Sequence, residues 1–253
     1  YITKNQGVVE VKNLTDFCNK NSLDKEFLEK YLTLNKCDLF FADKAILIEG
    51  TAERLLIPNM IDKIDKAKKF KAKNISLKSQ YYTLIEVGGA YAFRFIPFMK
   101  FLDIPTLIIT DIDSVSDDRK KCFVSEGKKT SNATINYWFK SILNKKETDY
   151  TFDDIKTLDD SNKTIANIHL EYQTEENGLC GRSLEEAIKN ANRELFMIGK
   201  TPTESDIDYK TSCDGSKTDF AMNLIFEESK QNYEVPKYIE NGLIWLDSQS
   251  NGR

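Results

Sequence analysis

The sequence predicts an α/β fold, in which a parallel sheet is covered by helices on both faces. Three continuous apolar runs, at 44–49 (KAILIE), 83–89 (TLIEVGG) and 106–111 (TLIITD), alternate with helical patterns at about 52–69 and 91–102. Strands that are buried on both faces are apolar throughout, and their alternation with helices predicts parallel pairing. At 253 residues and 40% hydrophobic, the chain is long enough to bury a large core.

We divide the chain into three parts. Residues 1–42 are expected to form a helical connector, because apolar residues recur at near-helical spacing in SLDKEFLEKYLTL. The α/β core is placed at 43–175, with an acidic surface loop at 147–163 and a short strand near 164–170. Residues 176–253 are expected to be a helical C-terminal part, with helices near 182–196, 216–230 and 236–247.

Composition limits the compartment and the chemistry. There is no apolar run of eighteen residues and no signal peptide, and the five cysteines include no C-x-x-C pair, so we expect a soluble protein in a reducing cytoplasm. The chain starts with Tyr1 rather than Met, so we expect either a fragment of a longer protein or a processed or trimmed terminus. The single histidine, His169, lies in an apolar run and is given a structural role, so chemistry that needs two imidazoles is excluded.

Acidic residues follow two of the predicted strands. Glu49 ends the first strand, and Asp111 and Asp113 end the third. Since ligands of open parallel sheets bind beyond the carboxyl ends of the strands, we expect these carboxylates to share one crevice, where a cation compensates their repulsion. Gly50 permits a tight turn, and Glu53 faces the same crevice from the first helical turn. Carboxylates without histidine or thiolate partners favour magnesium or manganese.

Other readings of these motifs remain open. Acids are favoured at a helix start by the macrodipole, and aspartates are common where a strand enters a turn. The D-x-D at 111–113 also looks like the nucleophile motif of haloacid-dehalogenase-like phosphatases, with Asp111 attacking phosphorus and Asp113 as acid and base. That motif usually opens its domain, whereas here a complete strand and helix precede it.

The motifs taken together resemble a known family. ILIEGTAERLLIP, the EVGG turn and the TDIDS strand look like a Toprim domain, which is Rossmann-like. FFADKAILIEGTAERLLIP, IPTLIITDIDS, GRSLEEAIKNAN and KTDFAMNLI resemble the C-terminal half of the OLD (overcoming lysogenization defect) family of ATP-dependent nucleases, from about residue 37 to 228. The resemblance implies a DNA-cutting Toprim domain fused behind an ABC-type ATPase, often in anti-phage defence.

The resemblance also assigns site residues. Carried over from the family, the metal ligands fall on Glu49, Glu53, Asp111, Asp113 and Glu185, and the active-site lysine falls on Lys217. We expect two Mg²⁺ or Mn²⁺ ions, with Glu49 and Lys217 as the catalytic residues. Ser183 and Glu186 have the spacing of a helix capping box beside Glu185.

The expected function is a metal-dependent DNA endonuclease or nickase that hydrolyses phosphodiester bonds by a two-metal mechanism. DNA and the ATPase domain are the expected partners, and a homodimer is an option. The basic loop that follows the D-x-D is expected to contact DNA phosphates through Arg119, Lys120, Lys121, Lys128 and Lys129. The alternative of another class is a non-cutting, nucleic-acid-binding or regulatory module that keeps the Toprim shape.

Overall fold

The computed structural model describes residues 2–5, 8–20, 37–70, 75–208 and 215–249. Its centre is a five-stranded sheet with the order β4-β3-β5-β9-β8. The strands β4 (Tyr82–Glu86), β3 (Lys44–Ile48), β5 (Thr106–Ile109) and β9 (Ile168–Glu171) pair in parallel, and β8 (Thr164–Ile165) joins the edge antiparallel to β9. The predicted α/β fold is therefore confirmed.

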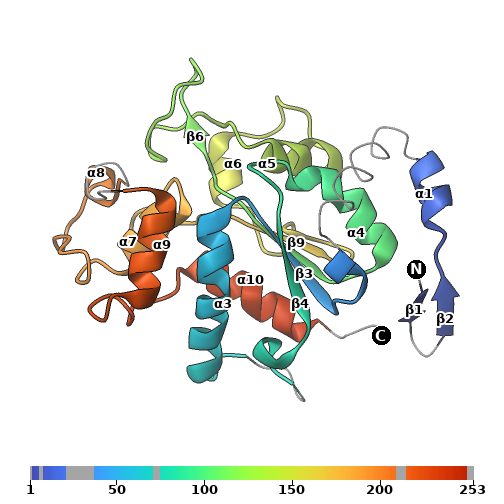
Figure 1. The fold of residues 1–253 in the computed structure, drawn as a ribbon. Helices are drawn as coiled ribbons and strands as arrows, with labels where there is room; N and C mark the ends of the chain where they lie inside the picture. The colour runs from blue at the N-terminus through green and yellow to red at the C-terminus, as the bar shows by residue number, and fades with distance from the viewer. Residues whose placement is uncertain (1, 6–7, 21–36, 71–74, 209–214, 250–253) are drawn as a thin grey trace.

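Alternation along the strands divides the core into two layers (Figure 1). Leu47 and Ile108 face one layer, which contains η3 (Ala92–Phe95), α4 (Ile96–Leu102), the π-helix η4 (Trp138–Ile142) and α6 (Phe152–Lys156). Ile46 and Leu107 face the other layer, which contains α3 (Thr51–Lys66), α7 (Leu184–Ala191), α9 (Lys217–Phe226) and α10 (Lys237–Ser248). Every residue of β3, β5 and β9 is buried, as continuous apolar runs predict.

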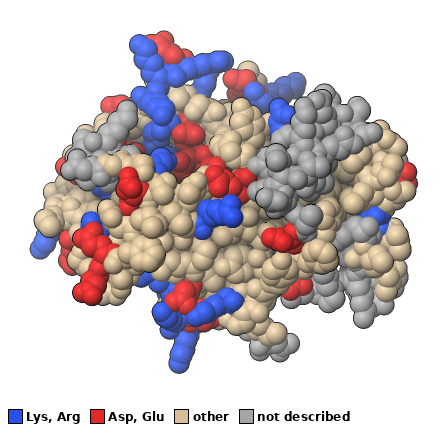
Figure 2. Space-filling view, viewed as in Figure 1, with Lys and Arg blue, Asp and Glu red and all other residues tan. Residues whose placement is uncertain are grey.

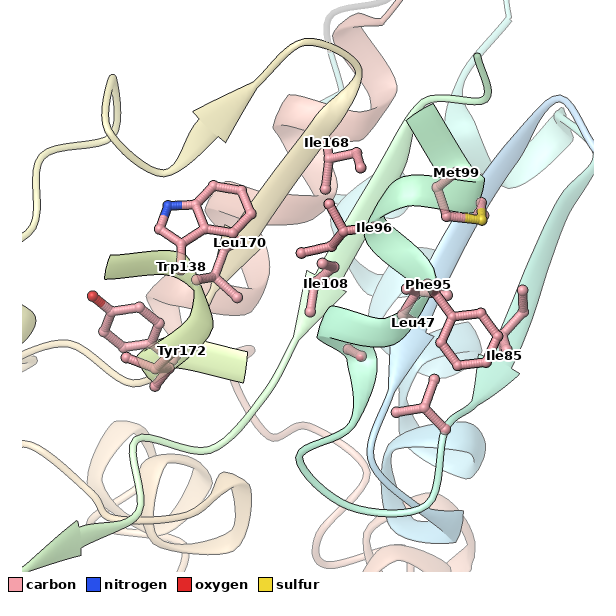
Figure 3. Packing of buried hydrophobic residues seen from close by; sticks show 14 of the residues in the cluster. Leu47, Ile85, Phe95, Ile96, Met99, Ile108, Trp138, Ile168, Leu170 and Tyr172 are labelled. Carbon is pink, nitrogen blue, oxygen red and sulfur yellow. The ribbon is translucent and has the colours of Figure 1, made fainter. Parts of the chain in front are cut away.

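The first layer is rich in aromatic side chains (Figure 3). Trp138 and Tyr172 lie against Leu170 at one end of the sheet, and Phe95 lies near Leu47 and Ile85 at the other. The indole of Trp138 donates to the Asn162 carbonyl (2.8 Å), and the Tyr172 hydroxyl donates to the Ile155 carbonyl (2.6 Å). The indole N–H and the phenol hydroxyl therefore both have hydrogen-bond partners, and the packed aromatic side chains support the sheet next to its carboxyl edge.

The N-terminal part differs from the expected helical connector. Residues of β1 (Ile2–Asn5) and β2 (Val8–Val11) form an antiparallel hairpin, followed by α1 (Leu14–Lys20) and the 3-10 turn η1 (Cys37–Phe40). The β-branched residues of ITKN and VVEV favour strands, which the helical interpretation of 1–42 overlooked. The segment SLDKEFLEKYLTL, on which the helical prediction rested, lies outside the described residues.

The remaining elements adjust several predicted boundaries. The acidic segment 147–163 contains α6, whose first turn is closed by a capping box between Thr151 and Asp154. The C-terminal helices occur where they were predicted but are shorter in two cases, and α8 (Glu204–Ile207) is additional. The helix α3 continues through Pro58, which lies on its exposed face. None of the helices within the described residues is both long and apolar enough to cross a membrane.

The carboxyl ends of the four parallel strands share one edge of the sheet, from which the connections to the following elements depart. Gly88 and Gly89 both have positive φ (74° and 81°), and Gly89 N donates to the Glu49 carbonyl (3.0 Å), so this turn depends on glycine. After β5 the chain forms a small ribbon from β6 (Ser114–Val115) and β7 (Lys129–Thr130), which leads into α5 (Ala133–Tyr137). The short η2 (Leu77–Ser79) lies at the opposite edge, before β4.

Candidate functional site

A cleft of about 570 Å³ opens at this edge of the sheet. Glu49, Asp111 and Asp113 line it together with Lys217. Glu53 and Glu185 are buried, with 6% and 0% of their surface exposed, and their charges act on Asp111 and Lys217. The structure therefore brings together every acid that the sequence assigned to the metal site, together with the lysine.

Glu49 is held by a network of donors. Its Oε1 accepts hydrogen bonds from Thr110 Oγ1, from the backbone N of Asp111 (3.2 Å) and from Nδ2 of Asn132 (3.0 Å). Burial raises the pKa of Glu49, although these hydrogen bonds oppose the shift. A carboxylate at the end of a buried strand is thus fixed in direction and kept near the opening of the cleft.

Asp111 is held by a second set of hydrogen-bond donors. Its Oδ1 accepts from Nε2 of Gln173 (2.6 Å) and from the backbone N of Leu184 (3.1 Å). Gln173 also accepts from Ile112 N (2.7 Å) and donates to the Tyr238 hydroxyl (3.1 Å). Burial, followed by the charge of Glu49, raises the pKa of Asp111 well above its ordinary value. A proton or a cation is needed to balance these acids.

Glu53 and Glu185 are the most deeply buried acids of the cluster. Burial, reinforced by the charge of Glu185, raises the pKa of Glu53 to about 7. Glu185 Oε2 accepts from Ser183 Oγ (2.7 Å), whereas no donor within the described part of the chain reaches the buried Oε1. An unsatisfied buried carboxylate oxygen is costly, and a bound cation would satisfy it.

Two basic side chains already neutralise part of this charge. Lys217 Nζ lies 2.9 Å from Glu185 Oε2 and 3.9 Å from Asp111 Oδ2, and its side chain is 50% exposed. Burial alone would lower the pKa of the Lys217 ammonium, but the carboxylates of Asp111, Glu185 and Glu53 raise it. Arg182 Nη2 lies 2.6 Å from Asp113 Oδ1. The location of Lys217 at the start of a helix is therefore explained by the acids that it faces.

Local structure places these side chains. Ser216 and Asp219 form a capping box that starts α9 at Lys217. At α7, Ser183 is the N-cap but its hydroxyl donates to Glu185, and the Glu186 carboxylate accepts from Arg182 N (2.6 Å), so the capping box predicted there is wrong. Thr51 is the first residue of α3, and its hydroxyl donates to Glu86 Oε1 (3.3 Å).

Sequence reasoning missed several residues of the site. Gln173 follows the fourth parallel strand, so the strand-end argument would have found it had that strand been included. Arg182 lies inside the GRSLEE motif, and Asn132 precedes a helix, as a cap does. His169 is buried, hydrogen-bonded to Thr164 (2.7 Å) and stacked on Trp245, in agreement with a structural role.

The metal fit can be judged from the donor set. All five predicted ligands are carboxylates, as hard divalent cations require, and the unpartnered Glu185 oxygen points to an additional positive charge. Within the described ranges, no group of three or more acids, cysteines or histidines is arranged to hold a metal ion as the side chains stand. Ion binding would therefore involve movement of Lys217 away from Glu185 and Asp111, and rotation of the acids other than Glu49 and Asp111, which their hydrogen bonds hold in place.

The basic loop lies beside the cleft. Arg119, Lys120, Lys121, Lys128 and Lys129 are all exposed. Figure 2 shows basic side chains projecting from the end of the molecule that carries β6, and acidic side chains in the middle of the same face. Of the five, only Lys121 lines the acidic cleft, so the loop does not approach it as one surface.

A family model matches part of the chain. Residues 40–113 match the family model for "Overcoming lysogenization defect protein-like, TOPRIM domain". This segment contains β3, β4 and β5 with Glu49, Glu53, Asp111 and Asp113. The resemblance predicted from the sequence is confirmed over these residues.

Particular relatives are consistent with this class. The chain is 27% identical over 290 residues to Endonuclease GajA of Bacillus cereus (strain HuB5-5), an alignment that covers 100% of this chain and 39% of that protein. The chain thus spans about two-fifths of the length of this curated relative.

Two solved structures are also similar. For the C-terminal region of the Burkholderia pseudomallei OLD protein the TM-score is 0.41 at 21% identity, covering 82% of this chain and 98% of that one. For the C-terminal region of the Xanthomonas campestris pv. campestris OLD protein it is 0.42 at 19% identity, covering 82% and 95%.

Proposed function

We propose that this chain is the nuclease part of a divalent-metal-dependent DNA endonuclease or nickase. The observation that carries the proposal is the convergence of five acids and Lys217 at the carboxyl edge of the sheet, with one buried Glu185 oxygen left without a partner. The similarity to Endonuclease GajA and the match to a TOPRIM family model support cutting over the phosphatase alternative.

Glu49, Asp111 and Asp113 would hold one ion, and Glu53 and Glu185 would hold or share a second. Mg²⁺ and Mn²⁺ fit an all-oxygen donor set. When bound, such ions polarise a phosphodiester and help to activate water. Placement of Glu49 by Asn132 and of Asp111 by Gln173 would fix the ligand directions before substrate arrives.

Lys217 and Glu49 would act on the substrate itself. Lys217 pairs with carboxylates that would hold the ions, so ion binding would free its ammonium to face the phosphate. A cation placed there would stabilise the charge that develops on phosphorus-bound oxygens, an effect commonly worth several kcal/mol. Glu49 lines the cleft at the end of β3, where its carboxylate could accept a proton from the attacking water. The exposed cations of the basic loop would bind backbone phosphates.

Plasmid cleavage with Mg²⁺ or Mn²⁺, with EDTA as a blank, tests this function. Glu49→Gln, Asp111→Asn and Lys217→Ala should each lower the cleavage rate by about 100-fold or more, because each removes a pre-placed charge. Asp159→Asn changes an exposed acid in the segment before β8 and should cut normally.

The opposite results are equally informative. Cleavage that survives EDTA, or that Glu49→Gln and Asp111→Asn leave unchanged, would contradict a metal nuclease. Wild-type protein that binds Mn²⁺ and DNA but leaves the plasmid intact would instead support the non-cutting nucleic-acid-binding module.

A further inference from the structure

A second cleft, of about 490 Å³, lies on the other side of the β6–β7 ribbon. Four cations line it, namely Arg119, Lys128, Lys129 and Lys140, and the only acid among the lining residues is Glu147. Glu147 pairs with Lys140 (3.0 Å), and both side chains are largely exposed. The formal charge of the lining is therefore about three positive units, in a chain whose net charge is −4.

The cations are positioned by backbone structure. Arg119 N donates to the Ser116 carbonyl (2.9 Å) and Lys128 N to the Val115 carbonyl (2.9 Å), and β7 carries Lys129. Arg119 also has a positive φ of 60°, which fixes the turn that presents it. A concave surface of net positive charge on a hydrogen-bonded ribbon concentrates its electrostatic field in the cleft, and an extended polyanion fits it.

The ribbon connects this cleft to the acidic one. Ser131, which lines the basic cleft, donates from its backbone N to the carbonyl of Asp113 (3.0 Å), which lines the acidic cleft. Asn132, the next residue, caps α5 and donates to Glu49. The two β-strands of the ribbon lie about 4.8 Å apart, and a DNA strand advances about 3.4 Å per nucleotide. A DNA strand would therefore cross the ribbon within a few nucleotides.

We propose that the cleft formed by Arg119, Lys128, Lys129 and Lys140 is a DNA-backbone site that holds the strand a few nucleotides from the acidic centre. The inference rests on the proposed function and assigns DNA-backbone binding and cleavage to two separate clefts. Lys121 lines the acidic cleft, whereas Arg119, Lys128 and Lys129 line the basic cleft. They act there with Lys140, which lies on η4 and which the sequence did not single out.

DNA binding without metal tests this site separately from cutting. Affinity for a 30-base-pair duplex is measured by fluorescence anisotropy in EDTA at several salt concentrations. The triple change Lys128→Gln, Lys129→Gln, Lys140→Gln should weaken binding by about 10-fold or more. The slope of log K against log salt should fall by about two to three, since each lost phosphate contact removes about 0.9.

A matched triple change controls for total charge. Lys66→Gln, Lys68→Gln and Lys237→Gln remove the same charge from exposed positions near the far end of α3 and the start of α10 (Figure 1). This variant should bind within about 3-fold of wild type, and replacing the three cleft lysines with arginine should preserve binding.

Three outcomes would overturn the proposal. They are equal losses in the two triple variants, no loss in the cleft variant, and displacement of DNA by inorganic phosphate beyond the effect of chloride at equal ionic strength, which would indicate a small-anion site. Circular dichroism melting confirms that each variant folds. A wild-type chain that binds DNA through this cleft but does not cut it would contradict the proposed function and still support this inference.

Discussion

Asn132 shows how one buried side chain serves both stability and the site. Its Oδ1 accepts from Thr134 N (2.9 Å) and Ile135 N (3.1 Å), which caps α5. Its Nδ2 donates to Glu49 Oε1 (3.0 Å), to Thr110 Oγ1 (2.7 Å) and to the Asp111 carbonyl (2.8 Å). The residue is fully buried, so each of these groups would lose a partner if the amide were removed.

We therefore expect Asn132→Ala to lower the free energy of unfolding by about 1–3 kcal/mol, since a cap and several buried hydrogen bonds are lost. The cleavage rate should fall as well, because Glu49 loses a donor that fixes its direction. Urea unfolding and plasmid cleavage measure the two effects. Asn132→Asp keeps the capping oxygen but adds a negative charge beside Glu49, so it should retain more stability than activity. Normal cleavage by Asn132→Ala would show that the amide does not position Glu49.

At the scale of elements, the loop before α7 decides where Glu185 lies. Gly181 is buried, and a Cβ built on it would lie 2.6 Å from Ala187 N and 2.9 Å from the carbonyl carbon of Glu186. These are backbone atoms of the helix that presents Glu185 and that supplies the Leu184 N–H to Asp111. The glycine of GRSLEE is required because the loop packs directly against the helix.

Gly181→Ala should push α7 away from the sheet. We expect a loss of about 1–3 kcal/mol of unfolding free energy, as for other overpacked sites, together with a marked loss of cleavage. Gly199→Ala is the matched control, since a Cβ there meets nothing within 4 Å, and it should change stability by about 0.5 kcal/mol or less. Thermal melting and cleavage of the two variants compare the sites. Equal behaviour would mean that the loop can move without cost.

At the scale of the whole molecule, the acidic cluster links stability to pH. Burial raises the pKa of Glu53 from 4.5 to about 7, and it raises the pKa values of Glu49 and Asp111 in the same direction. A raised folded-state pKa means that the protonated form is favoured in the folded chain. The contribution to stability is thus fully present below pH 4.5 and is lost as the pH rises to about 7.

Without divalent ions, we expect the melting temperature of wild type to fall between pH 5 and pH 8 relative to Glu53→Gln, which lacks the titrating carboxylate. Mg²⁺ should raise the wild-type melting temperature more at pH 8 than at pH 5, because ions bind the deprotonated acids. Scanning calorimetry at the two pH values, with and without Mg²⁺, measures both effects. A wild-type melting temperature that rises with pH relative to Glu53→Gln would contradict the assignment.

The sequence by itself determined the sheet and the residues at its carboxyl edge. Strands that are buried on both faces must be apolar, so KAILI and TLII could be predicted as strands from composition. Parallel strands end at the same edge of a sheet, so Glu49 and Asp111 could be predicted as neighbours. Capping at α7 was predicted wrongly, because spacing alone cannot tell which backbone N–H a carboxylate will reach. Strands of four residues near the N-terminus were too short for their period to stand out.

Only the tertiary structure decided which partners complete the site. Asn132, Gln173 and Arg182 reach Glu49, Asp111 and Asp113 from positions 62 to 83 residues away in the chain. Likewise, Lys140 lines the same cleft as Lys128 and Lys129 although it lies on a different element, η4. Periodicity and motif spacing act over one or two turns, whereas these contacts depend on how the packed layers bring distant segments together.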